Sequence, residues 1–273
     1  MPVRVETYDR LEDAARALAA SRSARYLGGG TLVMRAVNEA DQSFDTIIRV
    51  RDAALRDVRA ESERVVIGAG VTMAAVIAHR DLAFLAPVAR AVGGPAIRTM
   101  ATVGGNLFAA SPYGDFAAAL LALGATVDVA GGAAGRGVAI EDFLRDRERN
   151  AGLLVRSVTV PRPRDPAAFR FLKVTRVKPK GVSVMSIAAW LPQSGGRVAG
   201  ARIAYGAMGP APVRAVHVER VLDGQPLDAA TIERAAAVAT EGLDPPTDAL
   251  ASSWYRRQVA GVHLKRLLTA ERR

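Results

Sequence analysis

Cysteine is absent from the 273 residues of the chain, and histidine is scarce, with only His79, His217 and His263. Without cysteine the chain cannot hold an iron–sulfur cluster on thiolates, use a thiol nucleophile or form a disulfide. The histidines lie far apart in the sequence and match no HExxH or similar spacing, so a zinc site or a histidine-based triad has little support. We therefore expect no metal site and no catalytic residue on this chain, and any redox chemistry must use a bound organic cofactor.

Long apolar runs are also absent. No stretch of about 18 apolar residues occurs, which predicts no membrane span, and the N-terminal segment MPVRVETYDRLEDAARALAASR lacks the apolar core of a signal peptide. We therefore expect a cytoplasmic protein. Because 50% of the residues are hydrophobic, the chain can bury a sizeable core and divide into two or three subdomains.

Aromatic residues make up only 5% of the chain, whereas its net charge is +10, from 37 Lys and Arg against 27 Asp and Glu. A positive charge suits a nucleic acid, an acidic ligand or an acidic partner protein. The basic residues are scattered and form no recognisable nucleic-acid recognition module, so we expect no nucleic-acid partner.

The first part of the sequence predicts alternating helices and strands. Helical apolar spacing marks residues 8–20, and TIIRV (46–50) and RVVIGAG (64–70) are typical strands. The segment TMAAVIAH then predicts a helix with Thr72 as its N-cap.

FAAALLALG (116–124) predicts a further helix, which Asp115 can cap at its start and Gly124 can end in a left-handed conformation. ATVDVAG and RGVAIEDF are interpreted as paired strands around the turn GGAAG. A strand in LLVRSVTVPRPRDP runs into a proline-rich break. The segments AFRFLKVTRV, SVMSIAAWLP and VAGARIAYGAMGP predict antiparallel strands, followed by mostly helical structure from Pro212. Strands and helices in separate blocks favour an α+β fold over a doubly wound sheet.

The common dinucleotide signature, a strand followed by GxGxxG at a helix start, is only partly matched by VVIGAGVTM. Gly68 and Gly70 occupy the first two glycine positions, but Met73 stands at the third, where close helix–strand packing requires a small residue. No acidic residue follows at the end of a strand about 20 positions on. We interpret the segment as a strand that turns into a helix.

Two glycine-rich segments remain as candidates for binding a phosphate-bearing cofactor, LGGGTLVM (27–34) and TVGGNLFAASPYGD (102–115). Glycines let successive backbone N–H groups converge on an anion without a Cβ in the way, and a diphosphate has enough oxygens to bind two such loops. Asp115 cannot bind phosphate directly but suits a ribose or ribityl hydroxyl. A tight turn is the alternative for either loop alone. Side-chain donors are added by Thr31, Thr102, Asn106 and Ser111.

The order and spacing of these segments resemble the FAD-binding medium subunit of the molybdenum hydroxylases, the relatives of xanthine dehydrogenase and carbon monoxide dehydrogenase. The resemblance covers nearly the whole chain, and TVGGN followed by SPxxD is its most specific part. Other matching segments are YLGGGTLVM, IGAGVTM, EDF, FLKVTR, YGAMGPAPVRA and YRRQVAGVHLKRLL. The resemblance implies an α+β protein with a PCMH-type FAD-binding fold. Two α/β subdomains, residues 1–57 and 58–165, would precede a C-terminal α+β domain with a small antiparallel sheet, residues 166–273.

Carried over by position, the resemblance implies two phosphate loops and several further contacts to FAD. The first loop would consist of Gly28, Gly29, Gly30, Thr31, Leu32 and Val33, and the second of Thr102, Val103, Gly104, Gly105 and Asn106. The further cofactor-binding residues would be Ser111, Asp115, Val155 and Lys173. Asp115 would bind a sugar-chain hydroxyl, and Lys173 would place a cation near the flavin, where it favours the anionic reduced form. Relatives commonly carry a polar or acidic residue at the position of Leu32. Because leucine has no polar side-chain atom, one side-chain contact to the cofactor is lost here.

The function that the resemblance implies is an electron-transfer flavoprotein subunit of a heterotrimeric or heterohexameric molybdenum hydroxylase. A large subunit with molybdopterin would oxidise the substrate, and a small subunit with [2Fe–2S] clusters would pass the electrons to FAD and on to an external acceptor. The basic helix SSWYRRQVAGVHLKRLL is a candidate contact to an acidic partner. Two alternatives stay open: a self-contained FAD-dependent oxidase or reductase of the same fold, and a basic nucleotide- or nucleic-acid-binding module without flavin.

Overall fold

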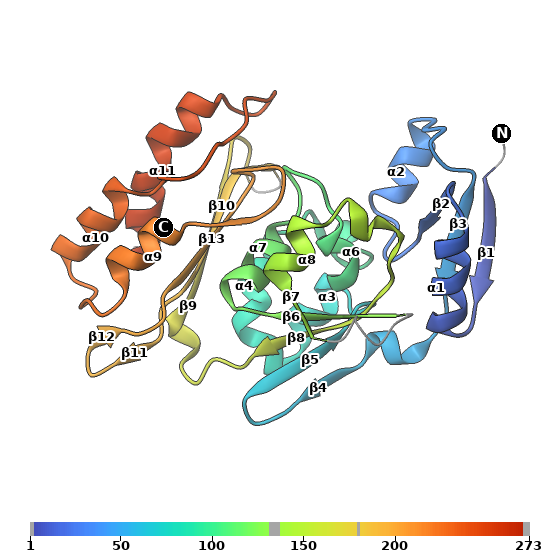
Figure 1. Ribbon diagram of the computed structural model, residues 1–273, viewed down its shortest axis with the longest axis horizontal. Helices are drawn as coiled ribbons and strands as arrows, with labels where there is room; N and C mark the ends of the chain where they lie inside the picture. The colour runs from blue at the N-terminus through green and yellow to red at the C-terminus, as the bar shows by residue number, and fades with distance from the viewer. Residues whose placement is uncertain (1–2, 131–136, 179–180, 270–273) are drawn as a thin grey trace. The chain divides into compact units, whose positions relative to one another are not determined.

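The computed structural model of the chain describes residues 3–130, 137–178 and 181–269 (Figure 1). Two compact units make up the chain, Met1–Ala109 with Ala125–Pro161, and Ala110–Gly124 with Arg162–Arg273. The segment Ala110–Gly124 therefore belongs to the same unit as the C-terminal part of the chain. The residues that follow it directly, Ala125–Pro161, return to the first unit.

A parallel sheet with the strand order β1 (Arg4–Tyr8), β3 (Thr46–Val50), β2 (Ala24–Tyr26) opens the first unit. Helix α1 (Leu11–Ala20) buries the apolar positions that its helical spacing predicts, and β3 covers the predicted strand TIIRV. Helix α2 (Val33–Asn38) follows β2. The sequence did not predict β1, because its side chains are mostly exposed and show no apolar alternation.

The second sheet of the first unit is antiparallel, in the order β4 (Val58–Ala60), β5 (Arg64–Gly68), β8 (Val155–Pro161), β6 (Thr126–Val129), β7 (Val138–Ala139). The predicted pairing of ATVDVAG with RGVA is confirmed by β6 and β7, whereas the turn GGAAG lies outside the described residues. The prediction that IEDF continues the strand is wrong. These residues begin helix α8 (Ile140–Arg145), because the buried side chains Ile140, Phe143 and Leu144 have helical spacing.

Strand β5 leads into helix α3 (Met73–Ala78), and the hydroxyl of Thr72 accepts a hydrogen bond from the N–H of Ala75, which confirms the predicted N-cap. Both sheet neighbours of β5 are antiparallel, so this strand and helix do not form the parallel βαβ unit of a dinucleotide fold. Gly68 instead allows a close backbone approach, since a Cβ there would lie 2.3 Å from the carbonyl oxygen of Leu55. The other helices in the described part of this unit are η1 (Ala53–Arg56), η2 (Arg80–Leu85), α4 (Ala86–Ala91), α5 (Pro95–Arg98), α6 (Val103–Leu107) and η4 (Arg149–Gly152).

The second unit is built on an antiparallel sheet with the order β14 (Val213–Arg214), β13 (Arg202–Gly206), β10 (Ser183–Trp190), β9 (Phe169–Thr175). The predicted antiparallel strands of this part are therefore confirmed. One face of the sheet packs against α9 (Val216–Leu222), α10 (Ala229–Ala237) and α11 (Ser253–Leu268) (Figure 1). The short elements are η5 (Pro166–Ala168), β11 (Gln193–Ser194) and β12 (Arg197–Val198).

Helix α7 (Asp115–Ala122) packs against β10 and β13 within the same unit. Gly124 follows it with φ +67°, as predicted for a left-handed C-terminal glycine. The predicted capping role of Asp115 is wrong, because Gly114 is the N-cap residue and Asp115 is the first residue of the helix. Its carboxylate points instead to partners in the sheet. Parallel and antiparallel sheets in separate blocks with helices confirm the α+β class. Within the described residues, no helix is long and apolar enough to cross a membrane.

Candidate functional site

The first glycine loop connects β2 to α2 in the first unit and carries a series of unused hydrogen-bond donors. The backbone N–H groups of Gly28 to Leu32 donate no hydrogen bond to any described residue. Gly30 has φ +75°, a conformation that favours glycine. Because backbone donors that face no protein acceptor need another partner, this loop is a candidate anion site.

Close packing against the segment before the second loop holds the first loop in place. A Cβ on Gly29 would lie 1.8 Å from the carbonyl oxygen of Met100, and a Cβ on Gly28 would lie 3.1 Å from the hydroxyl of Thr102. Only glycine fits at position 29 with this backbone. The first glycine loop therefore lies beside Thr102 and Gly105 of the second loop, within the first unit.

The second loop uses its donors inside the protein. The N–H groups of Val103 and Gly104 donate to the carbonyl oxygens of Val71 (2.9 Å) and Ala69 (2.8 Å). The N–H of Gly105 donates to the hydroxyl of Thr102 at 3.1 Å, which makes Thr102 the N-cap of α6. The N–H of Asn106 donates to the carbonyl oxygen of Thr102. In this conformation the second loop supports the first loop, and the unused donors belong to the first loop.

Asp115 and Lys173 lie together in the second unit. The side-chain nitrogen of Lys173 is 2.9 Å from Oδ2 of Asp115, and the hydroxyl of Ser183 donates a 2.6 Å hydrogen bond to Oδ1. The carboxylate is buried and the lysine is only slightly exposed, so solvent screens their attraction little. Sequence reasoning predicted Asp115 and Lys173 separately and missed Ser183, because neither their pairing nor the orientation of Ser183 has a sequence signal.

Ser111, Val155 and Leu32 are the predicted positions whose surroundings have not yet been described. Ser111 is half-buried in the second unit and precedes a cis peptide bond to Pro112. Val155 is the first residue of β8 in the first unit, and its side chain is buried. Leu32 is 38% exposed, so the apolar residue at this loop position faces solvent. Among the described residues, no group of three or more His, Asp or Glu could hold a metal ion.

Each of these two clusters, taken by itself, fits a part of a flavin adenine dinucleotide. Its diphosphate is an anion with many acceptor oxygens, which suits five consecutive unused N–H groups on a loop without side-chain obstruction at Gly29. Its ribityl and ribose hydroxyls can donate to a carboxylate such as Asp115 and accept from a cation such as Lys173.

Comparison with known proteins agrees with this fit. Residues 2–163 match the family model described as FAD binding domain in molybdopterin dehydrogenase, and residues 170–270 match the CO dehydrogenase flavoprotein C-terminal domain. The carbon monoxide dehydrogenase medium chain of Afipia carboxidovorans is 30% identical over 89% of this chain and 87% of its own length. The glyceraldehyde dehydrogenase medium chain of Sulfolobus acidocaldarius is 28% identical over 93% of this chain and 92% of its own.

Solved structures give the same result for the whole chain. A chain of the Cu,Mo-CO dehydrogenase superposes on this chain with a TM-score of 0.88 at 28% identity. The superposition covers 98% of this chain and 98% of the other. A chain of quinoline 2-oxidoreductase from Pseudomonas putida 86 superposes with a TM-score of 0.87 at 26% identity, and covers 99% of this chain and 96% of its own.

Proposed function

Because the chain belongs to the family of FAD binding domains of molybdopterin dehydrogenases, and is thus an FAD-binding oxidoreductase subunit, we propose that it transfers electrons within a molybdenum hydroxylase complex. In this proposal it receives electrons from the iron–sulfur clusters of a partner subunit and passes them to an external acceptor. Bound FAD supplies the redox chemistry, since a flavin exchanges electrons one or two at a time. The chain itself binds and orients the cofactor.

The single observation that carries the proposal is the run of unused N–H groups from Gly28 to Leu32. This run includes Gly29, where the backbone of Met100 leaves no room for a Cβ. We assign the diphosphate to this loop, which also includes Val33. In this proposal, residues Thr102 to Asn106 pack against the first loop and contribute the side chains of Thr102 and Asn106 to the site. Backbone donors that are already in place bind an anion without ordering flexible side chains.

The Asp115 carboxylate is assigned to a hydroxyl of the sugar chain and Lys173 to the flavin end of the cofactor. Their ion pair keeps both side chains in one orientation before FAD binds. Ser111 and Val155 complete the proposed set. A cation close to the flavin stabilises the negative charge that reduction adds, so Lys173 would raise the reduction potential.

The proposed partners are a small subunit with [2Fe–2S] clusters and a large subunit with molybdopterin. The medium chains that this protein resembles support them, since each relative is named as one chain of a dehydrogenase. The chain contains no cysteine, so thiolate-bound clusters must belong to another subunit. We propose a cytoplasmic location for the complex.

Absorption spectra of the isolated chain and of the complex co-purified with its partner subunits test this proposal. The isolated chain with added FAD should show flavin bands alone, and the complex should show flavin and iron–sulfur bands. In the complex, anaerobic addition of the substrate should bleach the flavin, whereas the isolated chain should not react. A colourless chain that takes up no FAD would refute the proposal, and substrate turnover by the isolated chain would favour a self-contained flavoenzyme instead.

A further inference from the structure

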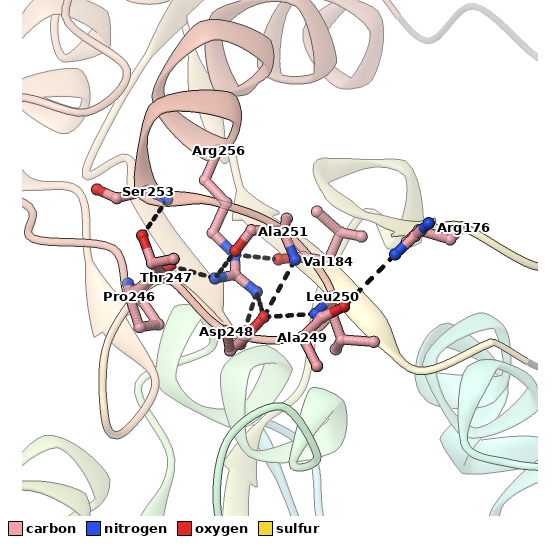
Figure 2. A network of polar contacts seen from close by, with 10 residues as sticks. All are labelled: Arg176, Val184, Pro246, Thr247, Asp248, Ala249, Leu250, Ala251, Ser253 and Arg256. Carbon is pink, nitrogen blue, oxygen red and sulfur yellow. Dashed lines mark hydrogen bonds and ion pairs between the residues drawn. The ribbon is translucent and has the colours of Figure 1, made fainter.

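Arg256 lies on α11 in the second unit and is completely buried, although it carries a permanent charge. Its guanidinium donates to both carboxylate oxygens of Asp248, at 3.0 and 2.9 Å, and to the carbonyl oxygens of Pro246 and Ala251 (Figure 2). The remaining N–H, at Nε, donates to the carbonyl oxygen of Val184 at 3.0 Å. A buried guanidinium is tolerated when its donors are satisfied in this way, and here Arg256 joins the loop before α11 to strand β10.

Val184 is the extra residue of a β-bulge. Ser183 of β10 is paired with Thr175 of β9, and Met185 is paired with Val174, so one residue on β9 is matched by two on β10. The extra residue of a bulge is left out of the regular ladder of hydrogen bonds. The carbonyl oxygen of Val184 is therefore available to the guanidinium, and Arg256 satisfies it.

The bulge decides which face of the sheet Ser183 occupies. Met185 and Ile187 belong to the core beneath the C-terminal helices, whereas Ser186 is paired with Lys173 on the opposite face. In a regular strand, Ser183 would share the face of Met185, because side chains alternate. The extra residue transfers Ser183 to the face of Lys173, where its hydroxyl donates to Asp115.

We propose that Arg256 is a positioning residue for the FAD site: it holds the bulge at Val184, which keeps Ser183 on the face where it orients Asp115 and, through the ion pair, Lys173. This inference rests on the proposed function in that it takes Asp115 and Lys173 as contacts to FAD. It adds that the site depends on helix α11 and the loop before it, to which none of the residues that we assign to FAD belongs.

The neighbouring residue Arg257 provides a matched control. It lies on the same helix and donates to the carboxylate of Asp244, which is almost fully exposed, and to the carbonyl oxygen of Leu243. Neither contact reaches the sheet. Loss of an arginine side chain and one ion pair from α11 is thus common to R256M and R257M, but only R256M removes the contact to the bulge.

The first measurement needs no cofactor. Crystal structures of the full chain with R256M, R256K and R257M should show the bulge and the Ser183–Asp115 hydrogen bond in R257M alone. R256K serves if R256M does not fold, because lysine keeps the charge but cannot reach Asp248 and Val184 together with a rigid fork. An intact bulge with Ser183 still bound to Asp115 in either Arg256 variant would overturn the proposal.

The second measurement is the Kd of FAD in a double-mutant cycle with S183A. We expect S183A to weaken FAD binding about tenfold, as for loss of a hydrogen bond to a charged group. R256M should weaken it to a similar degree, and the double variant should be no weaker than S183A alone, because both changes act through one contact. Additive effects of the two changes would overturn the proposal, since Arg256 would then act on FAD binding by another route than Ser183.

The flavin midpoint potential gives a readout that a loss of stability alone would not move. R256M should lower it in the same direction as K173M, and R257M should leave it unchanged; an unchanged potential in R256M would count against the proposal. If the parent chain binds no FAD, the proposed function fails. The crystal structures would then still decide whether Arg256 positions Ser183 and Asp115.

Discussion

Replacement of Gly29 with alanine is the sharpest perturbation of the first loop. The new Cβ atom would lie 1.8 Å from the carbonyl oxygen of Met100 and 2.6 Å from its carbonyl carbon. Non-bonded heavy atoms prefer separations of about 3.5–4.0 Å, so the loop must move away by about 1.7–2.2 Å. The obstacle is backbone and cannot rotate aside. Overpacking of this kind costs about 1–3 kcal/mol of folding free energy.

The displacement should affect FAD binding more than folding, because it moves the N–H groups that we assign to the diphosphate. A hydrogen bond to a charged group contributes about 1.5–3 kcal/mol, so misalignment of a single donor should weaken binding about tenfold or more. Titration of the deflavinated chain with FAD, followed by flavin fluorescence, gives the Kd, and thermal unfolding of the same sample gives the Tm.

Two alanine variants serve as references for this experiment. A Cβ on Gly28 would meet the Thr102 hydroxyl at 3.1 Å, where a side chain can yield, so Gly28→Ala should have a smaller effect. A Cβ on Gly152 meets nothing within 4 Å, and Gly152→Ala should match the parent. If Gly29→Ala binds FAD with the parent Kd and unfolds at the parent Tm, the diphosphate is misplaced and the packing against Met100 is not as described.

Two further predictions concern the stability of each unit. Partial burial raises the pKa of Asp248, but hydrogen bonds from the N–H groups of Leu250 and Ala251 and from its arginine partner outweigh it, so the pKa lies below its ordinary value. Between that lowered pKa and about 3.9 the unfolded chain binds more protons than the folded chain, so the free energy of unfolding decreases as the pH falls through this window. Urea unfolding at several pH values should therefore show a smaller decrease of the free energy of unfolding toward acid pH in D248N than in the parent. In the first unit, Thr72→Ala removes the N-cap hydrogen bond to Ala75 and should lower the free energy of unfolding by about 1 kcal/mol, measured by urea unfolding, and an unchanged midpoint would show that the cap contributes nothing.

Helical apolar spacing and short apolar runs in the sequence predicted most of these elements. Helix α1 buries one helical stripe, whereas strands β3, β10 and β13 are short apolar runs whose residues are mostly buried. The errors arise where such a pattern is missing or too short. Strand β1 is mostly exposed and shows no pattern, and α8 is too short for its helical spacing to be separated from the strand before it.

The candidate site was predicted only in part. Glycine-rich composition marked both loops, and the resemblance to a known family marked Asp115 and Lys173. Composition could not tell which loop keeps its donors unused, because that depends on acceptors such as the carbonyl oxygens of Val71 and Ala69, which come from another segment. The use of Asp115 was also mispredicted locally: a carboxylate next to a helix start suggests a cap, but its partners Lys173 and Ser183 are far away in the sequence.

The sequence by itself determined the class of fold, the absence of thiol chemistry, the two glycine loops and the family, because these follow from residue types and their spacing. Only the tertiary structure decided that Gly29 lies against the backbone of Met100, that residues 110–124 belong with the C-terminal part of the chain, and that a bulge at Val184 turns Ser183 toward Asp115. Each of these depends on contacts between segments that are distant in the sequence. The carbonyl oxygen of Val184 at the bulge, for example, accepts a hydrogen bond from Arg256 on α11.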